Sequence, residues 1–461
     1  MKRLFAICMV MALLIGFVVP AYAQAPFDQV VKIDEGRFTD KYKGTTLNVI
    51  MVVHPTSDIT KKHLQEFMDM TGMKVNLEIT PFDSIHQKEM LDLSSGTNSY
   101  DVMMIDNPWV AEYVSTGNVL ELTKYVEKED PLYMSDMVQN VNRMHGQVDG
   151  VQYAISIMGA GQLFMYRKDL LEQEKANFKA WAGRELTLPK TWYEFNEIAK
   201  FFTKKFNPKS PTEFGITVAA QKGNGALCMF QPVLWGIGGR EFGMSGRGKD
   251  AKWFVTCNNG KGVEAMKLFV EMAQYSPPGS GSNYWNEMNA VFLGKQCFMQ
   301  IQWDAFAPAE EAADSAVKGL VGYDVVPGPL ASPIIGGWPL VINKNTKNPD
   351  ASWEFVRWAT GPKFGFSLNK EGGELARVSL LTHPELVKMY PFYPAALETF
   401  KVVQQRTSPY VGGPTLKAVK EYEDYLGGEA SAAFTGQKSA EDAVDAAAKG
   451  LQGILETELG Y

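Results

Sequence analysis

Apolar runs alternate with amphipathic stretches along the first part of the chain. Residues 46–53 (TLNVIMVV) form an almost unbroken apolar run, which is typical of a strand buried on both faces. Pro55 and the polar residues after it favour a helix start, and Gly72 favours its end. The apolar positions between them follow roughly helical spacing, at Ile59, Leu64, Phe67 and Met68. We therefore expect a strand followed by a helix.

The same alternation continues to residue 109. Val75, Leu77 and Ile79 alternate as a second strand, a helix follows from Ser84, and residues 102–105 (VMMI) form a third buried strand. This order predicts a parallel sheet covered by helices, and such sheets bind ligands beyond the carboxyl ends of their strands. Those ends correspond to residues 54–58 and 106–109.

Clusters of proline, glycine and serine interrupt the middle of the chain, at residues 206–211, 276–283 and 327–333. An amphipathic helix is expected at residues 261–275, between the first two clusters. Near the end, Ser439 and Asp442 form a capping pair before one apolar helix face, made by Val444, Ala448, Leu451 and Leu455.

The first 23 residues are expected to be a cleavable signal peptide. Lys2 and Arg3 precede an apolar run at residues 4–19, and Ala21-Tyr22-Ala23 supplies a cleavage pattern before Gln24. Cys8 lies inside the apolar run, so a lipid-anchored cysteine at the cleavage point is not expected. We expect a periplasmic protein without a membrane span.

Composition narrows the class of protein. At 461 residues and 45% hydrophobic content the chain is long enough for two well-packed domains. A net charge of −7 argues against nucleic-acid and anionic-membrane partners. Beyond the leader, Cys228, Cys257 and Cys297 allow either one disulfide with a free thiol or three buried thiols.

Catalytic motifs are lacking in the sequence. The five histidines are scattered, and neither HExxH, CxxC, GxSxG nor a phosphate-binding loop occurs. A glycoside hydrolase would pair two carboxylates beside aromatic rings, but among 52 acidic residues any such pair is uninformative. We expect no enzymatic activity, no metal and no cofactor. A structural protein of the cell surface would need repeats or anchors, and the sequence shows no internal repeat.

Several segments resemble the extracellular solute-binding proteins of family 1, the sugar-binding subunits of ABC importers related to maltose-binding protein. The resemblance covers nearly the whole mature chain and includes YDVMMIDNPWVAEYVSTGNVLELTKYV (100–126), GQLFMYRKDLL (161–171), FLGKQCFMQIQWDAF (292–306), GGWPLVINKNTKNPDASWEFV (336–356), ARVSLLTHPEL (376–386) and FTGQKSAEDAVDAAAKGLQGIL (434–455). No segment is diagnostic alone, but their order and spacing together are specific.

The resemblance implies a two-lobe α/β periplasmic binding protein fold of type II, with mostly parallel sheets, helices on both faces and a hinge between the lobes. We expect residues 24–157 and about 286–335 to form the N-terminal lobe. Residues 158–285 and about 336–461 would form the C-terminal lobe. The implied function is that of a monomeric transport protein, which traps a small ligand between its lobes and presents it to the permease of an ABC importer.

The candidate ligand-binding residues come from the strand ends and from the resemblance. Strand ends supply His54, Ser57, Asp58, Asp106 and Trp109, although helix capping or a structural role would also account for the polar ones. The resemblance adds Gln162, Trp235, Trp303, Asp304, Gly337, Trp338 and Arg377. For the tryptophans the alternative is core packing, and for Arg377 it is a surface ion pair. Flat aromatic rings beneath C–H faces, with polar groups around the rim, suit a sugar.

The late segment narrows the ligand further. Maltose-type relatives carry an aromatic residue where this chain has residues 412–416 (GGPTL), which favours a monosaccharide, disaccharide or polyol over a long oligosaccharide. The alternative is a non-sugar solute on the same fold, such as a polyamine held by Asp58, Asp106 and Asp304, or a phosphorylated polyol. A ferric site would need paired tyrosines, and no adjacent pair occurs.

Overall fold

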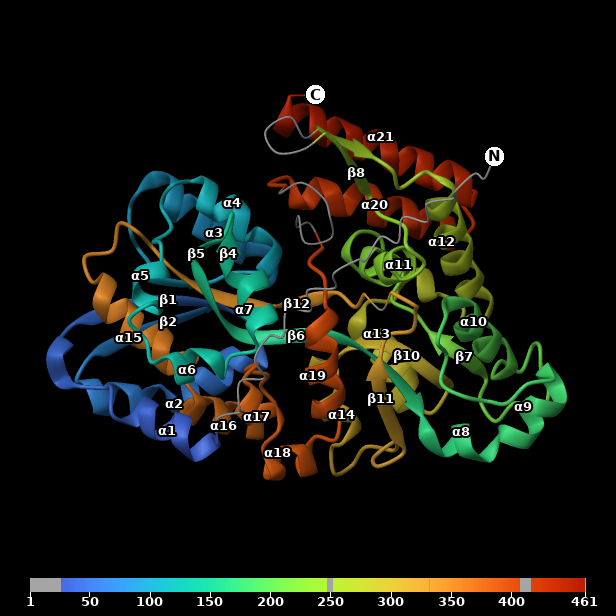
Figure 1. Ribbon diagram of the computed structural model, residues 1–461, viewed down its shortest axis with the longest axis horizontal. Helices are drawn as coiled ribbons and strands as arrows, with labels where there is room; N and C mark the ends of the chain where they lie inside the picture. The colour runs from blue at the N-terminus through green and yellow to red at the C-terminus, as the bar shows by residue number, and fades with distance from the viewer. Residues whose placement is uncertain (1–25, 247–251, 331, 407–415, 461) are drawn as a thin grey trace, which may run out of the picture.

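The computed structural model describes residues 26–246, 252–330, 332–406 and 416–460. Within these ranges the chain forms two α/β lobes that share one long strand, β6 (Ala154–Arg167) (Figure 1). The first part of β6 is antiparallel to β12, and the second part is antiparallel to β10 and β11. This strand therefore passes from one sheet into the other. The expected signal peptide lies outside the described residues.

The sheet of the N-terminal lobe has the order β2-β1-β3-β12-β6. Its other strands are β1 (Thr46–Val52), β2 (Lys74–Thr80), β3 (Val102–Met104) and β12 (Ile335–Ile342). β1 is parallel to β2 and β3, whereas β12 is antiparallel to both β3 and β6. The three strands expected from the apolar runs are confirmed.

Helices surround this sheet. The first group is α1 (Phe27–Glu35), η1 (Asp40–Tyr42), α2 (Pro55–Thr71), α3 (Phe82–Ser95), η2 (Asn107–Trp109), α4 (Val110–Ser115), α5 (Thr123–Val126), α6 (Pro131–Ser135) and α7 (Gln139–Gly146), with the hairpin β4 (Gln147–Val148) and β5 (Val151–Gln152). A later group comprises α15 (Pro349–Ala359), α16 (Pro362–Lys370), α17 (Val378–Leu381) and α18 (Pro384–Met389), and α19 (Tyr393–Val402) packs on the shared strand β6 and on β11.

The C-terminal lobe is built around β6, β10 (Cys297–Trp303), β7 (Phe214–Thr217) and β11 (Val321–Val325). Its helices are α8 (Lys168–Gln173), α9 (Lys175–Ala182), α10 (Trp192–Phe201), α11 (Asn224–Gly236), α12 (Gly260–Glu271), η4 (Met272–Gln274), η5 (Ser280–Ser282), α13 (Trp285–Leu293), η6 (Asp304–Phe306), α14 (Ala307–Glu310), α20 (Val419–Phe434) and α21 (Ala440–Leu459). A hairpin of β8 (Phe242–Ser245) and β9 (Lys252–Val255) flanks α21 (Figure 1).

The expected lobe boundaries after residue 285 are wrong. Residues 286–335 were assigned to the N-terminal lobe, yet β10 pairs with β7, and β10 and β11 pair with the C-terminal half of β6. Residues 336–461 were assigned to the C-terminal lobe, where α20 and α21 do pack on α11 and α12, yet β12 pairs with β3 and α15 packs on β12. The sheets are also mixed rather than mostly parallel, because the crossing strands β6 and β12 run against their neighbours.

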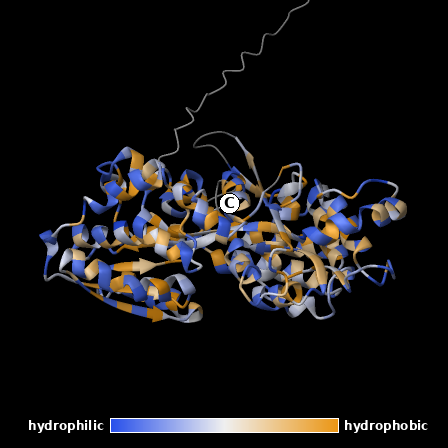
Figure 2. Ribbon diagram, turned by 90° about the horizontal axis from the view of Figure 1, so that it is seen from below, coloured by the Kyte–Doolittle hydropathy of each residue, from blue (hydrophilic) through white to orange (hydrophobic). Residues whose placement is uncertain are grey.

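Local signals in the sequence correspond well to the ends of the helices. Gly72 ends α2 with φ 66°, a conformation that glycine adopts without strain. The Ser439 hydroxyl accepts from the Asp442 backbone N–H at 3.0 Å and caps α21. In Figure 2 the hydrophobic colour follows the strands, while the helices alternate hydrophobic and hydrophilic positions. Cys228, Cys257 and Cys297 are free and buried. Of the two arrangements expected from the sequence, the structure therefore has three buried thiols and not one disulfide with a free thiol.

Candidate ligand-binding site between the lobes

One strand end from each lobe meets at the start of β12. The Asn107 side-chain amide, just after β3, donates to the Ile335 backbone oxygen at 3.3 Å. At Gly336 a Cβ atom would lie 3.0 Å from the indole ring of Trp303, the last residue of β10. Glycine at position 336 therefore allows this close approach without displacing the indole ring. The two lobes converge where parallel strands end, which is the usual position of a ligand site in such sheets.

Three aromatic rings of the N-terminal lobe gather beside this point. Phe82 stacks on Trp109 with ring centroids 5.5 Å apart, and Trp338 meets both rings edge-on at 5.9 and 6.0 Å. Phe82 is 49% exposed, whereas Trp109 and Trp338 are half-buried. The group therefore offers accessible aromatic surface that the lobe does not use in its core.

The C-terminal lobe contributes a second aromatic group. Trp303 meets Trp285 edge-on at 5.6 Å, and Tyr284 lies 5.1 Å from Trp285. The two tryptophans are each 8% exposed, but Tyr284 is 36% exposed. The Tyr284 hydroxyl and the Asn224 side-chain oxygen are 3.1 Å apart, so this aromatic group adjoins the start of α11.

A chain of polar side chains joins the lobes at the same place. Arg406 donates to the Asp106 carboxylate at 3.2 Å and lies 3.6 Å from the Glu423 carboxylate on α20. Its guanidinium also approaches the Cys228 sulfur at 3.8 Å. Asn224 donates to Glu423 at 2.9 Å. Because Asp106 follows β3 and Glu423 lies in the other lobe, Arg406 forms an ionic link between them.

Burial acts on the pKa values of the side chains in this polar chain. It raises the pKa of Asp106 to about 6, although the nearby guanidinium of Arg406 opposes the shift. Burial disfavours the charge of Arg406, but the carboxylates of Asp106 and Glu423 outweigh it and raise the arginine pKa. Burial also raises the pKa of the Cys228 thiol to about 12. At neutral pH Asp106 is therefore ionised beside the protonated Arg406, and the Cys228 thiol is neutral.

Four of the expected site residues lie in this region: Asp106, Trp109, Trp303 and Trp338. The capping alternative for Asp106 is not observed, because its side chain makes no capping hydrogen bond to η2 and binds Arg406 instead. Contact of these residues with a ligand stays a prediction.

Two further candidates, His54 and Asp58, lie at the start of α2. The His54 ring nitrogen Nδ1 accepts from the Thr56 backbone N–H at 3.1 Å, so His54 caps the helix. Burial lowers the pKa of His54 to about 4, which leaves the ring neutral. Asp58 is exposed in the first turn of α2. These positions favour the structural alternative for His54 and leave Asp58 accessible.

Three expected ligand contacts instead bond within the protein. The side-chain amide of Gln162 donates to the Cys228 backbone oxygen, and its oxygen accepts from the Ile334 N–H. The Trp235 indole N–H donates to Glu241 inside the C-terminal lobe. Ser57 is fully buried and its hydroxyl contacts the sulfur of Met104. Since none of these side chains is accessible, the assignment of all three to the ligand site is wrong.

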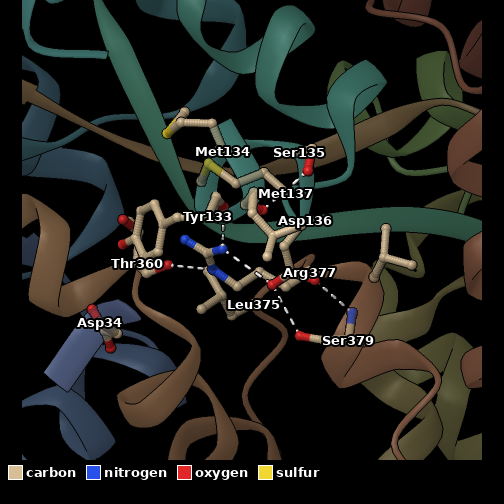
Figure 3. A network of polar contacts seen from close by, with 12 residues as sticks. Asp34, Tyr133, Met134, Ser135, Asp136, Met137, Thr360, Leu375, Arg377 and Ser379 are labelled. Carbon is tan, nitrogen blue, oxygen red and sulfur yellow. Dashed lines mark hydrogen bonds and ion pairs between the residues drawn. The ribbon is translucent and has the colours of Figure 1, made fainter. Parts of the chain in front are cut away.

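Arg377 is also a structural residue. It is fully buried, and its guanidinium donates to the backbone oxygens of Thr360 and Tyr133 and to the Asp136 carboxylate (Figure 3). Asp136 in turn accepts from the backbone N–H and hydroxyl of Ser379. The arginine therefore joins helices of the N-terminal lobe, and the expected ligand contact is wrong.

Asp304 and Gly337 serve the crossing strands. The Asp304 carboxylate is 2% exposed and accepts from the backbone N–H groups of Gly161 and Ala305. Gly337 has φ 112°, and a Cβ there would lie 2.2 Å from the Met158 oxygen on β6. The glycine is thus needed for close pairing of β12 with β6. Both residues were expected to contact ligand, and both are instead occupied by the protein's own backbone.

Sequence reasoning missed Phe82, Asn224, Arg406 and Glu423. Phe82 follows the carboxyl end of β2, so the strand-end rule that selected Asp106 would have found it. Arg406 and Glu423 carry no such signal, because they lie outside the strands and meet Asp106 only through the tertiary fold. The segment 412–415, used to narrow the ligand, lies outside the described residues.

In the described ranges, no helix is long and apolar enough to span a membrane. The same part of the chain contains no group of three or more histidine, cysteine, aspartate or glutamate residues that could hold a metal ion.

Comparison with known proteins identifies the family. The sequence model for bacterial extracellular solute-binding proteins matches residues 55–365. A probable amino-acid ABC transporter periplasmic-binding protein of Sinorhizobium fredii is 28% identical over 397 residues, covering 85% of this chain and 84% of that protein. The mannitol-binding protein of Pseudomonas aeruginosa is 26% identical over 319 residues, covering 65% and 68%. A solved solute-binding protein from Agrobacterium radiobacter K84, in complex with ribitol, has a TM-score of 0.72 at 24% identity and covers 88% of this chain and 98% of its own. Because the family model spans more than half of the sequence, this chain belongs to the bacterial extracellular solute-binding proteins.

Proposed function

We propose that this protein captures a small uncharged polyol or sugar between its lobes, in the periplasm, and delivers it unchanged to the permease of an ABC importer. The observation that carries the proposal is the meeting of two aromatic groups with the polar chain Asp106–Arg406–Glu423 at the junction of the lobes. The relatives named for mannitol and crystallised with ribitol support the same ligand class.

The chemistry of a polyol matches these groups. Its C–H faces can lie against the rings of Phe82, Trp109 and Trp338, which removes apolar surface from water. Each hydroxyl can donate to a carboxylate and accept from a guanidinium, so one ligand can satisfy both ends of the polar chain. Contacts to both lobes would stabilise the closed arrangement by the difference in affinity between open and closed forms.

Charged solutes match less well. A polyamine would place a second cation beside the guanidinium of Arg406, and a phosphorylated polyol would place an anion beside Asp106 and Glu423. A second candidate is an amino acid, favoured by the name of the Sinorhizobium relative. Its ammonium group would pair with a carboxylate and its carboxylate with Arg406.

The test is a ligand screen on the purified mature protein. Mannitol, ribitol, maltose, leucine and putrescine are titrated by calorimetry, and the thermal midpoint is followed in parallel because a ligand of the folded state raises it. We expect binding of at least one polyol or sugar. Failure of all three while leucine or putrescine binds would overturn the proposal in favour of the corresponding charged solute.

Trp338→Ala then tests the site itself. Removing this ring should weaken binding of the identified polyol or sugar about tenfold or more, equivalent to about 1.4 kcal/mol. Trp181→Ala, at a 38% exposed ring on α9, is the matched control and should leave the dissociation constant unchanged. Equal affinities of the two variants would show that the aromatic group of the N-terminal lobe does not contact the ligand.

A further inference from the structure

The polar chain between the lobes contains one positively charged group and two carboxyl groups. Arg406 is the cation, and its partners are two carboxylates, Asp106 from one lobe and Glu423 from the other. The side chain of Arg406 is 5% exposed, and those of Asp106 and Glu423 are 13% and 14% exposed. In the described part of the chain neither carboxylate has an ion pair with any other cation. Counted as formal charges, the three side chains Asp106, Arg406 and Glu423 therefore carry a net charge of −1, and removal of Arg406 would make it −2.

The neighbours of the guanidinium do not change this balance. Cys228 is a neutral thiol, and Asn224 and Tyr284 are uncharged. Arg406 itself stays protonated at every physiological pH, since its carboxylate partners raise its pKa further. Charges interact strongly where water is excluded. A single guanidinium therefore decides whether the site favours a neutral or a charged ligand.

We propose that Arg406 is the specificity-determining residue of this site, and that its positive charge restricts binding to uncharged polyhydroxylated ligands. With Arg406 in place, a ligand ammonium would face a cation and a ligand carboxylate would face two anions. A hydroxyl group suits both partners, because it donates to the carboxylates and accepts from the guanidinium. This inference rests on the proposed function and deepens it, because it names the residue that selects the ligand class.

Three six-carbon compounds provide the probes. Sorbitol, glucamine and gluconate share a polyhydroxylated chain and differ at one end, which is a hydroxyl, an ammonium or a carboxylate. Their dissociation constants are measured by calorimetry at pH 8, where Asp106 is ionised in the wild-type protein. We expect the wild-type protein to bind sorbitol at least tenfold more tightly than either charged compound.

Two substitutions should move this preference in opposite directions. Arg406→Gln removes the cation, so the ratio of glucamine affinity to sorbitol affinity should rise at least tenfold. Glu423→Gln removes one carboxylate, so the ratio of gluconate affinity to sorbitol affinity should rise at least tenfold. Arg406→Gln leaves two buried carboxyl groups side by side, which lowers their ionisation. Glu423→Gln is an independent test, because it retains the ion pair between Arg406 and Asp106.

The controls separate local charge from general effects. Lys420→Gln makes the same charge change as Arg406→Gln, one turn from Glu423 on α20, but at a side chain that is 75% exposed. It should leave both ratios unchanged. The double variant Arg406→Gln/Glu423→Gln also lacks the cation and keeps the Asp106 carboxylate, so its ratio of glucamine affinity to sorbitol affinity should stay above the wild-type ratio. Circular dichroism confirms the fold of each variant.

The outcomes distinguish this inference from the proposed function. If both single variants keep the wild-type ratios, or if Arg406→Gln does not bind glucamine, the role of Arg406 is overturned even where polyols bind the wild-type protein. If no polyol or sugar binds the wild-type protein, the proposed function fails. In that case binding of glucamine gained by Arg406→Gln would still support the charge selection by Arg406.

Discussion

Gly336 shows how one missing side chain positions the site. A Cβ at this residue would lie 3.0–3.4 Å from three atoms of the Trp303 ring, so a larger side chain must displace the indole. We expect Gly336→Val to lower the free energy of unfolding by about 1–3 kcal/mol, as overpacking does, and to weaken ligand binding. Urea unfolding and calorimetry measure the two effects.

Gly453 is the matched control for that substitution. It lies within α21, and a Cβ there would meet nothing within 4 Å. Gly453→Ala should therefore raise stability by about 0.5–1 kcal/mol through better helix propensity. Unchanged stability and affinity in Gly336→Val would show that Trp303 moves without cost, and that its contact with Gly336 does not position the ring.

Arg377 illustrates what a residue's type cannot reveal. Its place before a short helix matched a position near the ligand in the family, yet its guanidinium bonds to Asp136 and to the backbone of Tyr133, about 240 residues earlier. A buried arginine and a ligand-binding arginine look alike in one sequence, because the difference lies in distant partners. Trp235, which donates to the buried Glu241, was misassigned for the same reason.

At the scale of elements, helix ends followed local chemistry and could be predicted. The expected cap of α21 is present, with Ser439 accepting from Asp442 and the apolar face of the helix buried. We expect Ser439→Ala to lower the free energy of unfolding by about 1 kcal/mol, because the Asp442 N–H loses its partner. Urea unfolding measures the change, and Lys449→Ala, at an exposed position of the same helix, should have little effect. Equal stability of both variants would mean that α21 frays without cost.

The pairing of strands could not be predicted in the same way. Apolar runs identified β1 and β3, and alternation identified β2, but no local signal tells which sheet receives β10 or β12. Both flank the shared strand β6, and the chain passes between the lobes there. The order of elements along the sequence therefore predicts the fold class. The lobe boundaries after residue 285 could be found only from the observed pairing of the strands.

At the scale of the whole molecule, only one part of the site could be predicted from the sequence. The strand-end rule located Asp106 and Trp109, because it depends only on the order of strands and helices. The strand-end rule did not identify Arg406 and Glu423, because the segments before and within α20 reach the site only when both lobes are assembled. The aromatic part of the site thus follows from local pattern, and the ionic part from the tertiary fold.

Buried carboxyl groups also give the whole molecule a defined response to pH. Burial raises the pKa of both Asp304 and Glu310 to about 8, against about 4 in an unfolded chain. The folded state therefore binds more protons than the unfolded state between these values, so the free energy of unfolding falls as pH rises. His54 and His145, whose pKa values burial lowers to about 4 and about 3, act in the opposite direction only below about pH 6.5.

The window from pH 6.5 to 8 therefore isolates the carboxyl groups from these two histidines. Each group should contribute a slope of up to about 1.4 kcal/mol per pH unit, measured by urea unfolding at half-unit steps. Asp304→Asn and Glu310→Gln should each flatten the decline and stabilise the protein most at pH 8, because an amide carries no charge to bury. Glu441→Gln, at an exposed carboxylate on α21, should leave the slope unchanged. A wild-type stability that stays level or rises across this window would mean that both carboxyl groups are ionised in the folded protein, with partners strong enough to offset their burial.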